Sequence, residues 1–74
     1  MDINNAATTH SKTSLIRRKT VERLTALSRS RIYALMALGN FPKPVKLGAM
    51  SVAWLETEVH EWIESRITES RGVR

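Results

Sequence analysis

A segment rich in turn-forming residues divides the chain near its middle. Gly39 and Asn40 follow an apolar helical pattern, and Pro42 and Pro44 come soon after them. Glycine and asparagine admit the left-handed backbone that ends a helix, whereas each proline fixes its φ and lacks an amide donor. A helix is therefore expected to end here, and the chain to leave it along a rigid, extended path.

A short helical pattern begins at Lys19 or Thr20, well before this segment. Its apolar positions recur at every third residue and so share one face; they are Val21, Leu24 and Leu27. The pattern predicts a first helix, followed by a turn over residues 25–28.

Ser28 predicts the start of a second helix, from Arg29 to about Leu38. Its hydroxyl can accept from a backbone amide that is unpaired at the start of a helix. One side of this helix is expected to pack against the protein, through Ser28, Ile32, Leu35, Met36 and Gly39. The other side is expected to stay free, with Ser30, Tyr33, Ala34 and Ala37.

The part of the chain beyond the prolines predicts a hairpin and a last helix. Residues 45–47 and 51–54 alternate well enough for two short strands, and residues 15–17 are suited to a third. Acidic residues at 56–58 suit the positive end of a helix. The expected buried stripe of this helix is Leu55, Val59, Trp62, Ile63 and Ile67.

The large aromatic residues are expected in the core. Trp54 ends a strand, and Trp62 shares the helical stripe, so both fit packing better than base stacking on single-stranded nucleic acid. Phe41, next to Pro42, is expected to fill the space between the second helix and the hairpin.

Together these elements predict a fold that is mainly α with a small β-wing. The expected architecture is a winged helix-turn-helix of three helices with a two- or three-stranded antiparallel sheet. Residues 14–67 form this domain, residues 1–13 a flexible N-terminal arm, and residues 68–74 a frayed C-terminal tail.

Size and composition argue against several classes of function. A chain of 74 residues has a small core, and no set of side chains has the spacing of a catalytic site. The absence of cysteine and the separation of His10 from His60 argue against a metal site. We expect no cofactor, no small-molecule ligand and no membrane association, and a cytoplasmic location.

The charge of the chain is unevenly distributed. Nine basic residues and one acidic residue lie between Lys12 and Lys46, whereas residues 47–74 contain three basic and five acidic residues. A segregated positive charge around a helix-turn-helix pattern favours a polyanionic partner, namely double-stranded DNA.

Arg29 and Arg31 give the strongest signal for a DNA-binding role. They flank Ser30 directly after the N-cap, at the end of a recognition helix that faces base edges. Tyr33 lies on the free side, where its hydroxyl could bond a phosphate or a base. The candidate DNA-binding residues are Arg29, Ser30, Arg31, Tyr33, Lys43, Lys46, Arg17, Arg18 and Lys19.

A set of short motifs resembles the AlpA family of phage regulators and excisionases, which is related to MerR-like winged helices. The motifs are Ala26-Leu27-Ser28-Arg29-Ser30, Ile32-Tyr33, Gly39-Asn40-Phe41-Pro42-Lys43-Pro44, Trp54 and Val59-His60-Glu61-Trp62. The resemblance implies a regulator from a prophage or genomic island, an excisionase that acts with an integrase, or a protein with both roles. The chain departs from the family pattern at Ala26, where glycine is usual, and at Ala34 and Met50, where basic residues are frequent.

One alternative from another class remains open. The basic face could instead bind an acidic protein, as in an interaction module or an antitoxin-like subunit. For a DNA-binding protein, one recognition helix reads only a few base pairs, so we expect either a homodimer or cooperative assembly on DNA.

Overall fold

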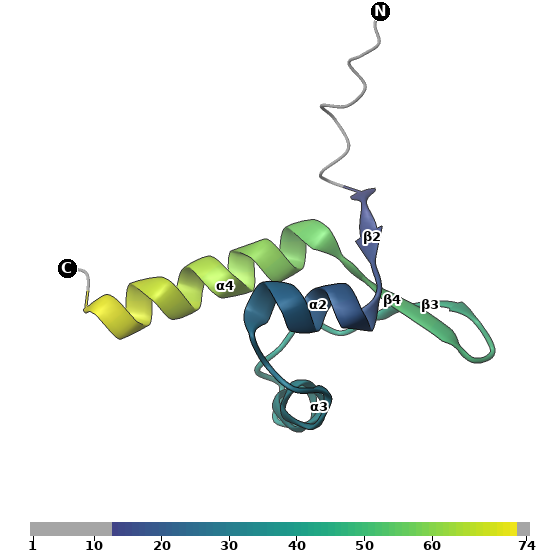
Figure 1. Cartoon of the computed structure of the whole chain (residues 1–74), viewed down its shortest axis with the longest axis horizontal. Coiled ribbons are helices and arrows are strands. Elements are labelled where there is room, and N and C mark those ends of the chain that lie inside the picture. The colour runs from purple at the N-terminus through teal and green to yellow at the C-terminus, as the bar shows by residue number, and fades with distance from the viewer. Residues whose placement is uncertain (1–12, 73–74) are drawn as a thin grey trace, which may run out of the picture.

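Three helices and three strands follow one another along residues 13–72, the part of the chain that the structure, a computed structural model, describes. In chain order they are β2 (Leu15–Ile16), α2 (Arg18–Thr25), α3 (Arg29–Ala37), β3 (Val45–Gly48), β4 (Ser51–Leu55) and α4 (Glu56–Arg71). Figure 1 shows α2 and α4 beside the sheet, and the β3–β4 hairpin extending away from the helices. The predicted fold class, three helices with a small antiparallel sheet, is confirmed.

The strand β4 lies at the centre of the sheet, between β2 and β3, and is antiparallel to both. The expected third strand is therefore present, with Leu15 opposite Leu55 and Ile16 opposite Trp54. The amide of Glu56 also donates to the carbonyl of Ser14 at 2.8 Å, which ties the start of α4 to the residue before β2.

The wing consists of β3, β4 and the two residues that join them. Lys46 pairs with Val52, but the register shifts between Lys46 and Gly48, so the ladder is irregular toward the tip. Such irregularities bend a strand and leave it partly unpaired. All four residues of β3 are exposed, which places most of the wing outside the core.

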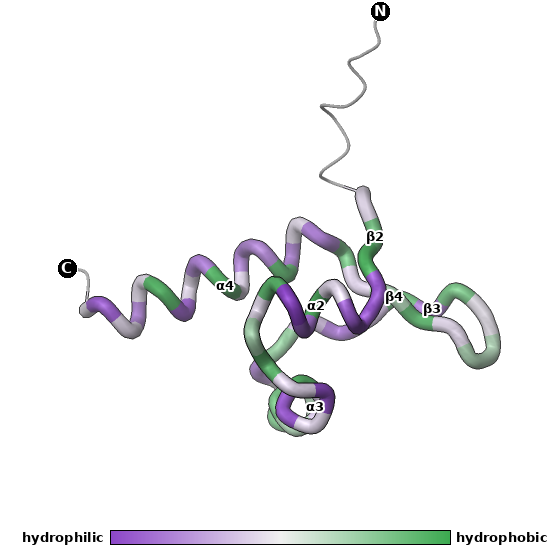
Figure 2. Tube along the Cα trace, viewed as in Figure 1, coloured by the Kyte–Doolittle hydropathy of each residue, from purple (hydrophilic) through white to green (hydrophobic). Residues whose placement is uncertain are grey.

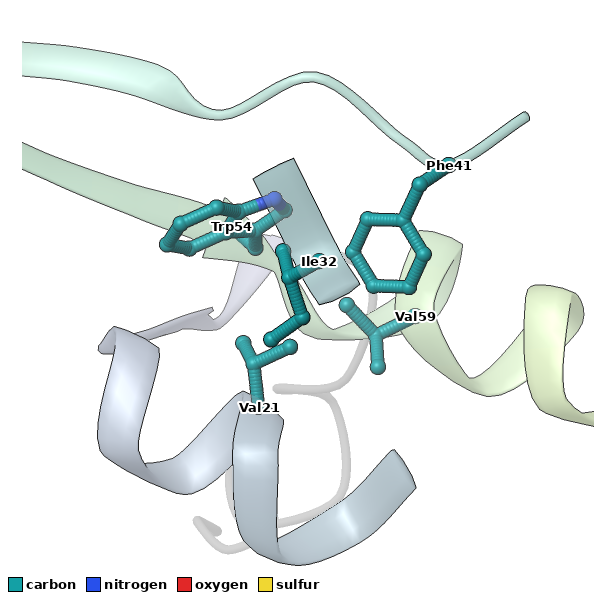
Figure 3. Close-up of a cluster of buried hydrophobic side chains, with 5 residues drawn as sticks. All are labelled: Val21, Ile32, Phe41, Trp54 and Val59. Atoms are coloured by element: carbon teal, nitrogen blue, oxygen red, sulfur yellow. The ribbon is translucent and has the colours of Figure 1, made fainter. Parts of the chain in front are cut away.

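The central cluster of the core contains one buried side chain from each helix, one from β4 and one from the loop after α3, and Ala53 of β4 is buried beside Trp54 in the sequence. Figure 3 shows this cluster, which consists of Val21, Ile32, Phe41, Trp54 and Val59. The indole Nε1 of Trp54 donates to the carbonyl of Pro42 at 3.0 Å, so this buried polar group is paired. The expected core positions of Trp54 and Phe41 are confirmed.

Trp62 lies at the edge of the core and is only partly buried. Its ring meets Phe41 edge to face, with centroids 4.9 Å apart, and its Nε1 donates to the carbonyl of Asn40 at 2.8 Å. The buried stripe predicted for α4 was wrong at its C-terminal end, because Ile67 is 47% exposed. The second half of α4 extends past α2 in Figure 1, away from the cluster that buries Val59.

The helix boundaries differ slightly from those expected. The first helix begins at Arg18, earlier than Lys19 or Thr20, and the last continues through Arg71 before Gly72, where the sequence suggested fraying from Thr68. The predicted N-terminal arm lies outside the described residues except for Thr13. Between residues 13 and 72, no helix is both long and apolar enough to cross a membrane.

Candidate nucleic-acid interface

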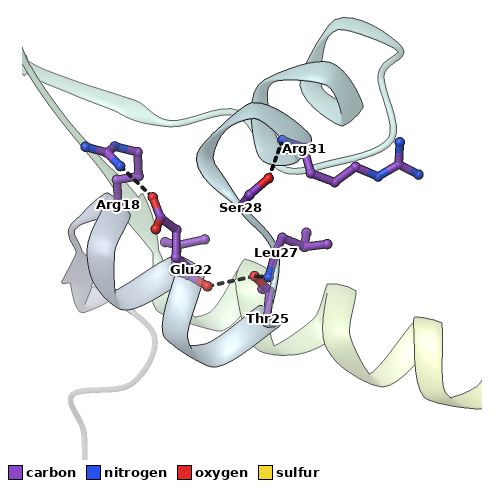
Figure 4. A network of polar contacts seen from close by, with 7 residues as sticks. Arg18, Glu22, Thr25, Leu27, Ser28 and Arg31 are labelled. Carbon is purple, nitrogen blue, oxygen red and sulfur yellow. Dashed lines mark hydrogen bonds and ion pairs between the residues drawn. The ribbon is translucent and has the colours of Figure 1, made fainter.

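The turn between α2 and α3 is held by two threonine contacts and a left-handed alanine. The hydroxyl of Thr25 donates to the carbonyl of Val21 at 2.8 Å and accepts from the amide of Leu27 at 3.2 Å. Ala26 adopts a φ of 63°, so the chain uses the left-handed conformation for which glycine is better suited. The short turn places α3 directly after α2. Figure 4 shows Thr25, Leu27 and Ser28 of this turn.

Both ends of α3 are formed as the sequence predicted. The Ser28 hydroxyl accepts from the Arg31 amide at 3.1 Å, which confirms the N-cap. At the other end, Gly39 has a φ of 78°, and the amides of Gly39 and Asn40 donate to the carbonyls of Met36 and Leu35. This pair of bonds is a Schellman motif, which pairs carbonyls that a helix end leaves free.

The orientation of α3 leaves its first turn accessible. Ile32 is fully buried against the core, whereas Arg29, Ser30 and Arg31 are all exposed. Tyr33 is 39% exposed, so one edge of its ring meets solvent. The predicted packed side of α3 is confirmed for Ile32, Leu35 and Met36 and the free side for all its residues, whereas Ser28 and Gly39, expected to pack, are exposed at the two ends of the helix.

The two arginines of α3 differ in their surroundings. The guanidinium of Arg29 lies over the ring of Tyr33, at 5.7 Å from its centroid. The Arg31 side chain extends away from α2 in Figure 4, and it has no ion pair within the described residues. Arg31 is thus the less restrained of the two.

A hollow joins the start of α2, the free side of α3 and the wing. It has a volume of about 340 Å³ and is lined by Arg17, Arg18, Lys19, Tyr33, Met50 and Val52. We call it the basic hollow. It brings four of the candidate residues together, although they come from two helices and the residue before α2.

The three basic residues of this hollow are not equivalent. Arg17 donates to the Ser51 hydroxyl at 2.9 Å and to the Val52 carbonyl at 3.1 Å. Arg18 is engaged by Glu22, one turn further along α2, in an ion pair shown in Figure 4. Lys19 is exposed and has no ion pair in the part of the chain that the structure describes.

The two lysines near the wing occupy different surroundings. Lys46 is exposed on β3. In the strand register it lies opposite Val52, and Val52 lines the basic hollow. Lys43 instead lines a second hollow of about 530 Å³ with Pro42, Glu58, Glu61 and Trp62. The structure therefore brings neither lysine into the lining of the basic hollow.

The tip of the wing is apolar. Met50 is 96% exposed, and Leu47 is exposed on the neighbouring strand. In Figure 2 the outer part of the hairpin is mainly green and white, which marks hydrophobic and neutral residues. Charge near the wing comes from Lys46 on β3 and from the three basic residues of the basic hollow.

Acidic residues and histidine form no metal site in the part of the chain that the structure describes. No three such side chains come together between residues 13 and 72. His60 instead lies 3.2 Å from a carboxylate oxygen of Glu56, one turn before it on the exposed face of α4.

The helices α2 and α3 are joined by a short turn with an N-cap, and the wing follows them in the chain. This arrangement defines a winged helix-turn-helix domain. The chain belongs to the AlpA family, since the family profile described as "Prophage CP4-57 regulatory protein (AlpA)" matches residues 14–67. Over 47 residues it is 51% identical to a protein of Enterobacteria phage P4 that is described as "Uncharacterized protein ORF88". That alignment covers 64% of this chain and 53% of the phage protein, so the chain spans about half the length of this relative.

Proposed function

We propose that this protein binds double-stranded DNA sequence-specifically as a regulator from a prophage or genomic island. The observation that supports this most is the basic hollow, in which the start of α2, the free side of α3 and the wing share one surface. A surface of this kind can follow a duplex across a groove and its flanking phosphates.

The charge in and around the basic hollow suits a phosphate backbone. Lys19 lines the hollow, whereas Arg31 and Lys46 lie elsewhere on α3 and β3. Lys19, Arg31 and Lys46 are exposed, and none has an ion pair within residues 13–72. Binding of such residues to DNA releases condensed counterions, and this release supplies much of the affinity of a small DNA-binding domain.

The base-reading role falls to the first turn of α3. Arg31 has the planar guanidinium that bonds guanine O6 and N7 together, and nothing in the described part of the protein occupies it. Ser30 and Tyr33 lie on the same exposed part of α3 and have hydroxyls suited to a base edge or a phosphate. Lys46 supplies a point charge from the wing.

The biological role follows from family membership and stays a proposal for this chain. We propose control of transcription, stimulation of excision together with an integrase, or both, because each requires specific binding with or without bending at repeated sites. We also propose a homodimer or a cooperative row of protomers on DNA in the bacterial cytoplasm, since one α3 contacts only a few base pairs.

The test is a titration of the full chain against labelled duplexes from its own promoter and attachment region. Four to six phosphate contacts give an expected slope of roughly −4 to −5 for log affinity against log salt concentration. Unrelated duplex should compete, but at higher concentration. A slope near zero, together with capture of an acidic protein that duplex DNA cannot displace, would favour the alternative of a protein-interaction module.

A further inference from the structure

A single arginine connects the start of the helix-turn-helix to the wing. Nη1 of Arg17 donates to the Ser51 hydroxyl at 2.9 Å and to the Val52 carbonyl at 3.1 Å. Ser51 and Val52 are the first two residues of β4, directly after the turn at the wing tip. The link thus reaches the wing at the tip end of β4, and it joins residues that are 34 and 35 positions apart in the sequence.

Arg17 also occupies a position where arginine is a poor choice for local structure. It is the N-cap of α2, with an extended backbone, and its side chain makes no cap hydrogen bond. Serine, threonine, aspartate and asparagine are preferred there, because their oxygens accept from the first free amides of the helix. An arginine has no acceptor to offer, so its presence at this position is better explained by the contact with β4.

Apart from Val52, Ala53 and Trp54 of β4, which are buried or packed against the core, the wing has little other support from the helices. All of β3 is exposed, and the strand register is irregular between Lys46 and Gly48. Figure 1 shows the hairpin extending away from α2, α3 and α4. A hairpin whose tip and β3 strand are exposed would sample several angles relative to α3 unless further contacts restrained it.

We propose that Arg17 is a positioning residue, which holds the wing at a fixed angle to α2 and α3 before DNA is bound. This inference rests on the proposed DNA-binding function, and it assigns Arg17 a role other than that of one more phosphate contact. We call the two bonds from Arg17 to Ser51 and Val52 the clamp. A wing that is already in place loses less conformational freedom on binding, so the clamp raises affinity through preorganisation. Ser51 acts as the acceptor that completes the clamp.

The clamp is first tested in the free protein. Amide hydrogen exchange across residues 45–53 is compared in wild type, Arg17→Ala, Arg17→Lys and Ser51→Ala. Exchange in the wing should accelerate by roughly threefold to tenfold in Arg17→Ala, as expected for the loss of ordinary hydrogen bonds, and by less in Ser51→Ala. The matched control is Arg23→Ala, which removes an exposed arginine of α2 whose guanidinium bonds only weakly, to Thr20 at 3.5 Å. It should leave wing exchange unchanged.

Affinity and salt dependence then separate positioning from charge. A lysine keeps the positive charge of Arg17, but its nitrogen lies one bond closer to the backbone than Nη1, the atom that donates to both acceptors, so it is expected to fall short of them. If Arg17 positions the wing, Arg17→Lys and Ser51→Ala both lose affinity, by roughly twofold to tenfold, with the salt slope of the wild type. If Arg17 is a phosphate contact, Arg17→Lys and Ser51→Ala bind like wild type, and Arg17→Ala lowers the slope by about one.

Either that second pattern or unchanged wing exchange in Arg17→Ala would overturn the inference. If wild-type protein binds no duplex at any salt concentration, the proposed function fails. The exchange comparison then decides alone whether Arg17 holds the wing, because it needs no DNA.

Discussion

The guanidinium of Arg29 lies over the ring of Tyr33, with 5.7 Å between the guanidinium carbon and the ring centroid. Both side chains are exposed on α3, one turn apart. A contact of this kind at an exposed site contributes about 0.5–1 kcal/mol. The contact therefore limits the side-chain motion of both Arg29 and Tyr33, two candidate DNA-binding residues.

Substitution of Tyr33 separates its ring from its hydroxyl. Tyr33→Phe keeps the ring under Arg29 and loses only the hydroxyl, so a direct contact of that hydroxyl with DNA predicts a loss of about 0.5–1.5 kcal/mol. Tyr33→Ala also removes the ring and should lose more. Fluorescence anisotropy on the specific duplex measures both losses, and equal thermal stability of the variants controls for folding. Wild-type affinity in Tyr33→Ala would mean that Tyr33 contacts no DNA.

Arg31 and Lys46 should differ in what they contribute. Arg31→Ala is expected to weaken the specific site by about 1–3 kcal/mol and unrelated duplex much less, because a bidentate base contact exists only at the right sequence. Lys46→Ala should weaken both duplexes by similar factors and reduce the salt slope by about one. The measurement is a titration of each variant on cognate and scrambled duplexes at several salt concentrations.

Lys43 provides the comparison for Lys46. It lies in the hollow with Glu58 and Glu61, so Lys43→Ala should change the salt slope less than Lys46→Ala. Equal losses on both duplexes for Arg31→Ala would show that α3 does not read the sequence. An equal effect of the two lysine variants would show that DNA also passes over the hollow that Lys43 shares with Glu58 and Glu61.

Ala26→Gly is expected to stabilise the protein. Alanine at a φ of 63° is strained by about 1–2 kcal/mol relative to right-handed backbone, and glycine is not. Glycine also gives the unfolded chain more freedom, which lowers the stability of the folded state by about 0.4–1 kcal/mol. The net stabilisation should therefore be about 0.5–1 kcal/mol. Urea unfolding measures it. A loss of stability would mean that the surrounding contacts of Thr25 already accommodate the alanine without strain.

Trp62 should contribute to stability through both its ring and its indole nitrogen. Trp62→Ala is expected to cost about 3 kcal/mol, at the low end for a large aromatic residue, because the side chain is only partly buried. Trp62→Phe keeps most of the packing on Phe41 but loses the bond to the Asn40 carbonyl, at about 1 kcal/mol. Chemical denaturation measures both. Unchanged stability with lost DNA binding in Trp62→Ala would assign the residue to the interface.

Local signals in the sequence were sufficient to predict much of the fold. Ser28 and Gly39 act through hydrogen bonds to backbone within a few residues, so their roles as helix start and helix end could be predicted from their neighbours. The periodic apolar pattern likewise predicted Trp54 and Val59 as core residues.

Contacts between residues far apart in the sequence could not be predicted from the sequence pattern. The bonds of Arg17 to Ser51 and Val52 depend on how the wing packs, and periodicity contains no information about that packing. The separate surroundings of Lys43 and Lys46 have the same origin. That Arg17 is the N-cap of α2 also came only from the structure, because the sequence predicted a helix that begins later, at Lys19 or Thr20.

The pairing of β2 with β4 has a consequence for the newly made chain. Leu15 can meet Leu55 only after both helices and the hairpin between them have been synthesised, so the sheet closes late and through a long-range contact. Arg17, Arg18 and Lys19 follow β2 directly, and their position beside the wing depends on that closure. A nascent chain whose α3 has already left the ribosome therefore still lacks the assembled surface, and the proposed DNA-binding site is complete only when the whole domain has folded.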